Sequence, residues 1–429
     1  MRVLRFLTVS AALLLVGAVA ATAQPFSSGS TGSDGALTYT TPGTYSLDPA
    51  ALNLNPAGDN IFNFTTITIA SGVTLRLDSG NLRGKPVIWL ATGNVTIAGT
   101  LDLGGLSAPN LGSLGADWIS QRLPTSPGAG GFPGGVGARP GTASYAGSGP
   151  GGGPANAAGS NSCKNNQSNP ASFATLGGTG FGGQPGSTYG NVQLVPLIGG
   201  SGGAGGCVPA TVTAADASGG TGGAGGGAIR IVSSTSISLT GSIDARGGTG
   251  GGGRSGGGSG AGGSGGAINL IAPVVTGTGT MRTFGGGPGV AAGAGYVLIN
   301  AGTNTYTGFD SDGIVTLRPL LAPPLPTPST QPTITVTSVN GVNVNQPAKG
   351  LFLSPDVTIN ATGAVTIAIT ATGIPVGTVV TFNILSELGA DQNISCTPLA
   401  GTLASSTATC SASFPTSVSI MLGSASWGS

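Results

Sequence analysis

The chain of 429 residues contains no histidine, a single glutamate, and only 6% charged residues. The absence of histidine excludes Ser-His-Asp and Cys-His catalysis and most metal triads. Since Glu387 is the only glutamate, a hydrolase or lyase would have to use aspartates. The formal net charge of +1 favours neither nucleic acid nor an anionic membrane surface as a partner. We therefore expect no nucleic-acid partner and no cofactor.

Long apolar runs are absent except at the N-terminus. Arg2 and Arg5 precede the apolar stretch Leu7 to Ala20, and Ala21-Thr22-Ala23 is a small-residue cleavage site. Residues 1–23 therefore predict a cleaved signal peptide and a secreted or cell-surface location. A membrane anchor is the weaker interpretation because the run is short and ends in a cleavage pattern. We expect no transmembrane segment in the mature chain.

Glycine, in contrast, is abundant, at 83 residues, about a fifth of the chain against a usual level of about 7%. From Gly247 to Ala267 the sequence is organised in triplets with glycine at nearly every first and second position. A three-residue period matches the extended left-handed helix with about three residues per turn. Glycine on two faces lets such backbones approach one another closely. Arg254 and Ser259 interrupt the pattern and are expected to face solvent.

Short strand-like pieces recur in blocks of similar sequence. The blocks are Pro86 to Gly105, Ala228 to Gly248 and Ala267 to Gly286, and Ile229 and Ile268 are 39 positions apart. Each block holds three alternating pieces, as one coil of a parallel β-helix requires. We predict an all-β chain with a right-handed parallel β-helix and glycine-rich (GGX) excursions, followed by an immunoglobulin-like β-sandwich.

The composition divides the chain into six parts. After the signal peptide come the N-terminal part of the β-helix (24–104), a glycine-rich excursion (105–227), and β-helix rungs with a GGX tract (228–319). A proline-rich linker (320–332), expected to be extended and stiff, leads to the predicted sandwich (333–429).

The four cysteines are Cys163, Cys207, Cys396 and Cys410. Export permits disulfides, and the even count suits two bridges. Pairing by proximity gives Cys163–Cys207 and Cys396–Cys410. The spacing fits no zinc site, so structural bridges are the prediction.

Alignment of the blocks places Asp102, Asp244 and Arg282 at one position of the coil. One interpretation is a small acidic catalytic site with a basic partner, as in polysaccharide-cleaving enzymes. The other, which we favour, is a surface ion pair worth at most about 1 kcal/mol. Asp310 and Asp312 echo the start of a calcium loop, but the other ligands are missing and a polar turn is favoured.

Threonine alternates in three runs, at Thr66/Thr68, Thr276/Thr278/Thr280 and Thr303/Thr305/Thr307. Flat threonine arrays can bind ice or crystalline carbohydrate. The alternative is that β-branched residues simply suit strands.

Three elements together resemble a group of uncharacterised exported glycine-rich parallel β-helix proteins of soil bacteria of acidobacterial type. They are the stretch Phe62 to Gly105, the returns GGGAIRI and GGSGGAINLIA, and the segment TPLAGTLASSTAT near the C-terminus. The resemblance implies secretion and a β-helix, and it supplies no active-site residues. A looser similarity links the rungs to adhesin passenger domains.

The leading hypothesis is an exported, non-enzymatic structural or adhesin-like protein of the bacterial surface or matrix. Its expected partner is an extracellular polysaccharide or cell-surface glycan. The alternative is a polysaccharide lyase or hydrolase that uses Asp102 or Asp244. A third hypothesis is ice or crystal binding through the Thr-x-Thr runs.

Overall fold

The computed structural model describes residues 26–55, 58–115, 118–159, 169–179, 183–287, 291–309, 313–320, 332–346, 348, 355–386 and 392–425. Within these ranges the chain forms mainly strands and extended segments, together with the 3₁₀ turn η1 (Leu111–Ser113). No described helix is long and apolar enough to cross a membrane. The predicted signal peptide and most of the predicted linker lie outside the described residues.

Two parallel sheets form the first part of the fold. The larger contains β1 (Gly35–Tyr39), β3 (Ile61–Ile69), β5 (Val87–Ala91), β6 (Val95–Ile97), β8 (Ala228–Ser233), β9 (Ser236–Leu239), β11 (Ala267–Gly277), β13 (Tyr296–Tyr306) and β14 (Ile314–Pro319). The smaller, in the order β12-β10-β7-β4-β2, contains β2 (Gly43–Ser46), β4 (Val73–Arg76), β7 (Thr100–Asp102), β10 (Ser242–Asp244) and β12 (Thr280–Arg282).

The larger sheet closes on itself. Strand β3 pairs with β5 through Ile61–Phe64 and with β6 through Ile67–Ile69. Strand β11 likewise pairs with both β8 and β9. The hydrogen bonds therefore join β11-β8-β5-β3-β6-β9 into a ring of six parallel strands. The prediction of a right-handed parallel β-helix followed by an immunoglobulin-like sandwich is wrong: the all-β chain combines this closed ring with a second parallel sheet and two antiparallel sheets.

The interior of this first part is built from columns of apolar side chains in register. One column is Ile67, Val95, Ile237 and Val275, and a second is Leu75, Leu101, Ile243 and Met281; all eight side chains are fully buried. Burying each such side chain contributes about 1.5–3 kcal/mol. The alternation of apolar and polar residues in the sequence follows from this arrangement, because successive side chains point to opposite faces of a strand.

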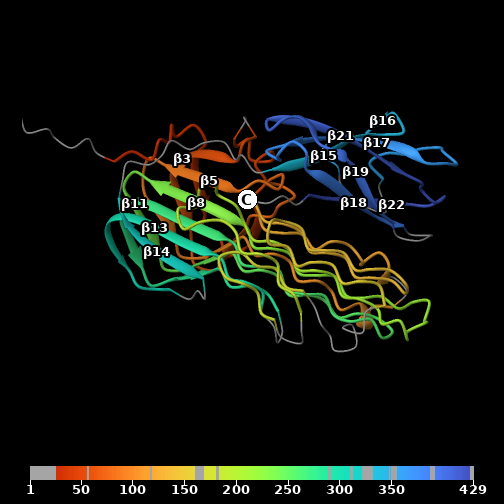
Figure 1. Ribbon diagram of the computed structural model, residues 1–429. Helices are drawn as coiled ribbons and strands as arrows, with labels where there is room; N and C mark the ends of the chain where they lie inside the picture. Colours follow the sequence, from red (N-terminus) through yellow and green to blue (C-terminus); the bar gives the residue numbers. More distant parts are fainter. Residues whose placement is uncertain are drawn as a thin grey trace, which may run out of the picture.

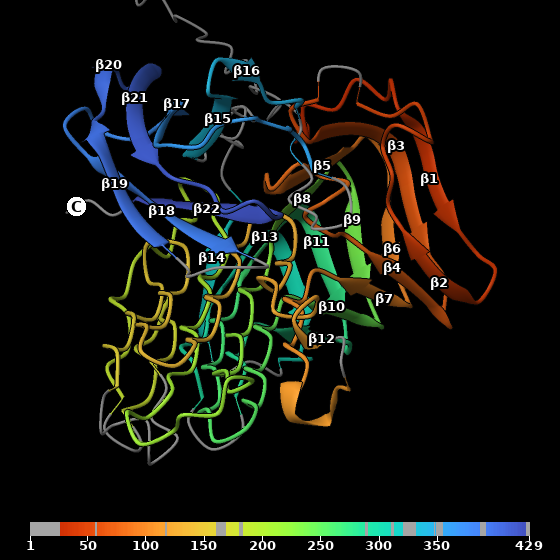
Figure 2. The ribbon, with the colours of Figure 1, turned by 90° about the vertical axis from the view of Figure 1, so that its right-hand side faces the viewer.

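Glycine-rich segments extend from the ends of the strands and lie side by side (Figures 1 and 2). We call the segments 130–138, 199–207, 218–227, 245–254 and 257–266 the glycine bundle. The amides of Gly200, Gly203 and Gly206 donate to the carbonyls of Gly226, Gly223 and Gly220 at 2.8, 2.9 and 2.8 Å. The amides of Gly226, Gly223 and Gly220 donate in turn to the carbonyls of Ser264, Ala261 and Gly258. Hydrogen bonds at every third residue are what a threefold extended helix produces.

Close backbone contact explains why these positions hold glycine. A Cβ atom on Gly223 would lie 1.9 Å from the Gly248 carbonyl oxygen, and one on Gly225 would lie 1.9 Å from that of Gly200. Non-bonded carbon contacts are favourable at about 3.5–4.0 Å. Segments with side chains at these positions could not approach closely enough to form the hydrogen bonds.

The register of the strands continues into the bundle. Ala228 of β8 pairs with Ala267 of β11, 39 positions later. In the segments that precede these strands, the amides of Gly226 and Gly223 donate to Ser264 and Ala261, each 38 positions later. A difference of one is expected, because in a parallel ladder an amide bonds to a carbonyl beside its paired residue. The bundle therefore extends the hydrogen-bonded order of the sheets.

Arg254 does not face solvent as expected. Its side chain is 22% exposed and forms an ion pair with Asp216 at 3.2 Å. Its guanidinium lies 5.7 Å from the ring centroid of Trp118. The other interruption of the triplet pattern, Ser259, is half-buried. Arg254 therefore departs from the expectation because Asp216 and Trp118 contact its side chain, whereas Ser259 keeps part of its surface exposed.

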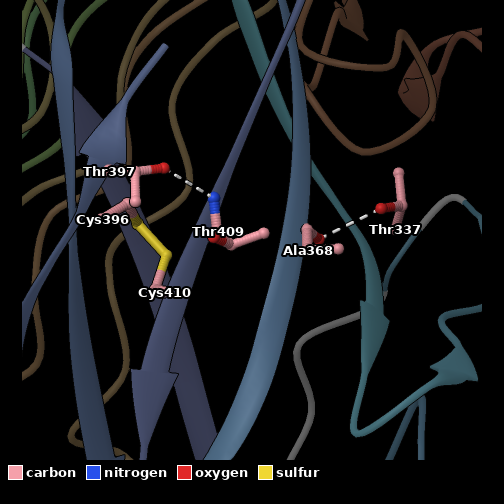
Figure 3. Close-up of a disulfide and its surroundings, with 6 residues drawn as sticks. All are labelled: Thr337, Ala368, Cys396, Thr397, Thr409 and Cys410. Carbon is pink, nitrogen blue, oxygen red and sulfur yellow. Dashed lines mark hydrogen bonds between the residues drawn. A yellow bond between two sulfur atoms is a disulfide. The ribbon is translucent and has the colours of Figure 1, made fainter. Parts of the chain in front are cut away.

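The C-terminal part forms two antiparallel sheets around one apolar core. One contains β15 (Thr333–Val339), β16 (Val342–Asn343), β17 (Val365–Thr372), β20 (Ala400–Thr402) and β21 (Ser405–Ala412), and the other β18 (Val379–Ser386), β19 (Gln392–Pro398) and β22 (Ser419–Ala425). The disulfide Cys396–Cys410 joins β19 to β21 and so links the two sheets (Figure 3). Beside it, the Thr409 amide donates to the Thr397 hydroxyl at 3.1 Å. The predicted Cys396–Cys410 bridge is confirmed.

Candidate binding groove

A groove of about 1130 Å³ lies between the smaller parallel sheet and glycine-rich backbone. One wall consists of outward side chains of β4, β7, β10 and β12. The rest of the lining consists of chain that continues from these strands, including 104–107, 246–249 and 284–287, together with Thr175 and Leu176; we call it the second wall. The glycines of this second wall leave much of it as bare backbone.

Four charged residues form a column across the sheet wall. Arg76, Asp102, Asp244 and Arg282 are paired in register on the neighbouring strands β4, β7, β10 and β12. Strands of a sheet are about 4.8 Å apart, so the two aspartates are immediate neighbours. The structure thus brings together the three residues aligned from the sequence, although Asp102 and Asp244 are 142 positions apart.

Each aspartate is held by an arginine. Arg76 Nη1 lies 2.9 Å from Asp102 Oδ2, and the two side chains are 27% and 22% exposed. Asp102 Oδ1 also accepts the Gly104 amide at 2.8 Å. Arg246 Nε donates to both oxygens of Asp244 at 2.9 Å, and the Asp244 side chain is 9% exposed. Both carboxylates are therefore fixed in position as hydrogen-bond acceptors.

An aromatic ring lies beside the second ion pair. The Arg246 guanidinium is 5.3 Å from the centroid of Phe284, a half-buried residue that also lines the groove. A cation over a ring face gains about 0.5–1 kcal/mol at an exposed site and more when desolvated. This contact orients Arg246 toward Asp244, and the sequence alignment gave no indication of it.

Arg76 and Arg246 are the site residues that the sequence analysis missed. The sequence contained a signal for Arg76. The strand-like stretch Val73 to Leu77 precedes the strand of Asp102 and places Arg76 at the position that corresponds to Asp102. Arg246 follows Asp244 by two residues, so in an extended chain both side chains leave on one side. Both arginines could therefore have been identified as site residues from the sequence.

Hydroxyl groups form a second column beside the charged one. Thr44, Thr74, Thr100, Ser242 and Thr280 are paired in register across all five strands of the smaller sheet. The Ser242 hydroxyl donates to Thr100 Oγ1 at 3.0 Å. Thr100 and Ser242 line the groove together with the charged residues. The sheet wall therefore presents hydroxyl groups on β7 and β10 beside the charged side chains.

A longer hydroxyl column lies on the outer face of the ring. Thr38, Thr68, Thr96, Ser238, Thr276 and Thr305 are paired in register on six successive strands. A shorter column lies two positions earlier on β9, β11 and β13, where it pairs Ser236, Val274 and Thr303. All three predicted Thr-x-Thr runs thus contribute to this face. Thr280, from the run 276–280, lies instead on the smaller sheet.

The remaining predicted site residues are only partly described. Cys207 is disulfide-bonded, while Cys163 lies outside the described residues, as do Asp310 and Asp312. The described ranges contain no cluster of three or more residues able to hold a metal ion.

Comparison of the chain with protein-family models, with curated proteins and with solved structures finds no match. The function proposed below therefore rests on the geometry of the groove and of the hydroxyl column.

Proposed function

We propose that the protein is an exported, non-enzymatic, adhesin-like component of a bacterial surface or matrix that binds polysaccharide in the groove. The observation that carries the proposal is the pair of polar columns on the groove wall. Sugars offer many hydroxyl groups that both donate and accept hydrogen bonds. Fixed carboxylates, guanidinium groups and hydroxyls, placed beside exposed backbone, complement such a ligand.

The ion pairs support a role in binding. In the groove, arginines donate to both Asp102 and Asp244. Each carboxylate is thus already held in an ion pair, which supports a role as a fixed hydrogen-bond acceptor for a ligand.

Export is supported by two features. The N-terminal sequence has the pattern of a signal peptide, and the bridge Cys396–Cys410 suits an oxidising compartment. Surface or matrix attachment follows from export together with glycan binding.

The test is affinity electrophoresis of the protein through gels that contain soluble extracellular polysaccharides. Thr100→Tyr fills the groove with a bulky side chain, and Arg246→Gln removes the partner of Asp244. We expect both variants to lose retardation, whereas Thr407→Tyr, on an exposed strand position of the C-terminal part, keeps it. Retardation unaffected by either groove variant contradicts the proposal. Polysaccharide cleavage abolished by Asp244→Asn would replace it with the enzyme hypothesis.

A second candidate function is favoured by the hydroxyl column on the ring. Its six members repeat at about 4.8 Å from strand to strand, and Thr38, Thr96 and Thr305 are exposed. A regularly spaced, uncharged array of this kind suits an ordered surface such as ice or crystalline carbohydrate. Thr96→Tyr should abolish inhibition of ice growth while Thr100→Tyr leaves it intact; absence of inhibition by the wild-type protein eliminates this candidate for ice.

A further inference from the structure

We infer that the ligand of the groove is an acidic linear polysaccharide that lies across the strands from β2 to β12, and this inference rests on the proposed function. The site is a track with several equivalent positions rather than a pocket for one sugar. Three observations support this: the continuity of the polar columns, the gradient of burial along them, and the charges at their ends.

The polar columns run beyond the groove. Ser46 on β2, a polar uncharged residue, is in register with Arg76 and continues the charged column by one strand, and the hydroxyl column begins at Thr44 on the same strand. Four steps of about 4.8 Å give a track about 19 Å long from β2 to β12. Each strand contributes one residue of each column, so a linear chain that crosses the strands meets a pair of polar side chains at every step.

Burial in the charged column increases from β2 to β10, and Arg282 on β12 is half-buried. Thr44 and Ser46 are exposed, Arg76 and Asp102 are half-buried, and Asp244 is buried. The track is therefore open at the β2 end and walled by glycine-rich backbone at the β10 end. A chain can enter the groove with one end and continue over the open part of the sheet, which suits a polymer.

The charges favour an acidic chain. Among the described residues that line the groove, three are arginines, Arg76, Arg246 and Arg282, and two are aspartates, Asp102 and Asp244. The lining thus has a surplus of one positive charge in a protein that is otherwise nearly neutral. Arg76 and Arg282 lie at the two ends of the lining column, three strand steps or about 14 Å apart. Carboxylate or sulfate groups fit at these ends, and sugar hydroxyls fit at the aspartates between them.

The experiment is titration calorimetry with oligogalacturonates of increasing length, beside uncharged oligosaccharides of the same lengths. We expect affinity to rise with length until the oligomer covers the track, and acidic oligomers to bind more tightly than neutral ones. Arg282→Gln should lower the affinity for acidic oligomers by about tenfold, which corresponds to the loss of one charge-assisted hydrogen bond. The affinity for neutral oligomers should be unchanged. Thr44→Tyr should lower the affinity for the longer oligomers only, while Thr407→Tyr should change the affinity for none of them.

The outcomes separate the inference from the function on which it rests. Equal affinity for acidic and neutral oligomers, or affinity independent of length, overturns the acidic track but leaves polysaccharide binding in place. Absence of binding by any oligomer or polymer overturns both. Binding that Thr100→Tyr and Arg282→Gln leave intact places the ligand elsewhere and also overturns the inference.

Discussion

Replacing Gly223 by alanine tests whether the glycine bundle is held together by backbone contact. The added Cβ would lie 1.9 Å from the Gly248 carbonyl oxygen and 2.4 Å from its carbon. An ordinary contact is about 1.5 Å longer, so the two segments must separate by more than 1 Å. Gly223 also donates to Ala261 at 2.8 Å and accepts from Gly203 at 2.9 Å, and the shift strains both hydrogen bonds.

The expected cost follows from these contacts. Overpacking a tight interior costs about 1–3 kcal/mol, and each weakened hydrogen bond adds about 0.5–1.5 kcal/mol. We expect Gly223→Ala to lower the free energy of unfolding by about 3–5 kcal/mol in urea denaturation. The control is Gly115→Ala, where a Cβ meets nothing within 4 Å and alanine stabilises by about 0.4–1 kcal/mol if it acts only through the unfolded chain. Equal stability of the two variants would refute the contact explanation.

Three further predictions concern other parts of the molecule. Cys396→Ser opens a bridge between residues 14 positions apart and should cost about 3 kcal/mol, measured as faster proteolysis of the C-terminal part; unchanged proteolysis would contradict it. Burial raises the pKa of the Tyr189 hydroxyl far above its usual range. In the unfolded chain this hydroxyl ionises at pH of about 10, whereas in the folded protein it stays neutral. The contribution of Tyr189 to the free energy of unfolding is therefore complete below this pH and decreases above it, and Tyr189→Phe should reduce this alkaline loss of stability in thermal scans. Arg230 is 8% exposed; its Nη2 donates to the Leu194 carbonyl at 3.0 Å, while its Nε has no hydrogen-bond partner. Because the cost of burying this charge exceeds the gain from one hydrogen bond, Arg230→Met should raise the free energy of unfolding by about 1 kcal/mol; a decrease would show that the hydrogen bond to Leu194 outweighs the cost of burial.

The all-β character and the positions of many strands could be predicted from the sequence, because half-buried strands impose a period of two. The alignment of Asp102, Asp244 and Arg282 rested on the recurrence of similar blocks in the sequence. The closed ring was not predictable in this way. Strand β3 (Ile61–Ile69) contains no glycine or proline where it changes partner from β5 to β6. A change of partner without such a residue leaves no local signal in this part of the sequence.

The glycine-rich segments show a different limit. Their three-residue period indicated extended helices, but glycine has no side chain with which to specify a neighbour. Gly223 bonds to Gly203 and Ala261, and nothing in the triplets distinguishes these partners from others. Arg254 was misjudged for the same reason, since its contacts with Asp216 and Trp118 depend on which segments adjoin it.

The register shared by sheet and bundle explains how the groove is positioned. Asp102 and Asp244 are paired 142 positions apart in the sheet. The segments that follow them keep this register, since the amides of Gly105 and Ala108 donate to the carbonyls of Arg246 and Thr249, each 141 positions later. The same strands thus supply the polar columns of one wall and, a few residues later, the glycine backbone of the other. Because each wall fixes the register of the other, the spacing of the groove is set by backbone hydrogen bonds, and the charged side chains on its surface can vary without moving it.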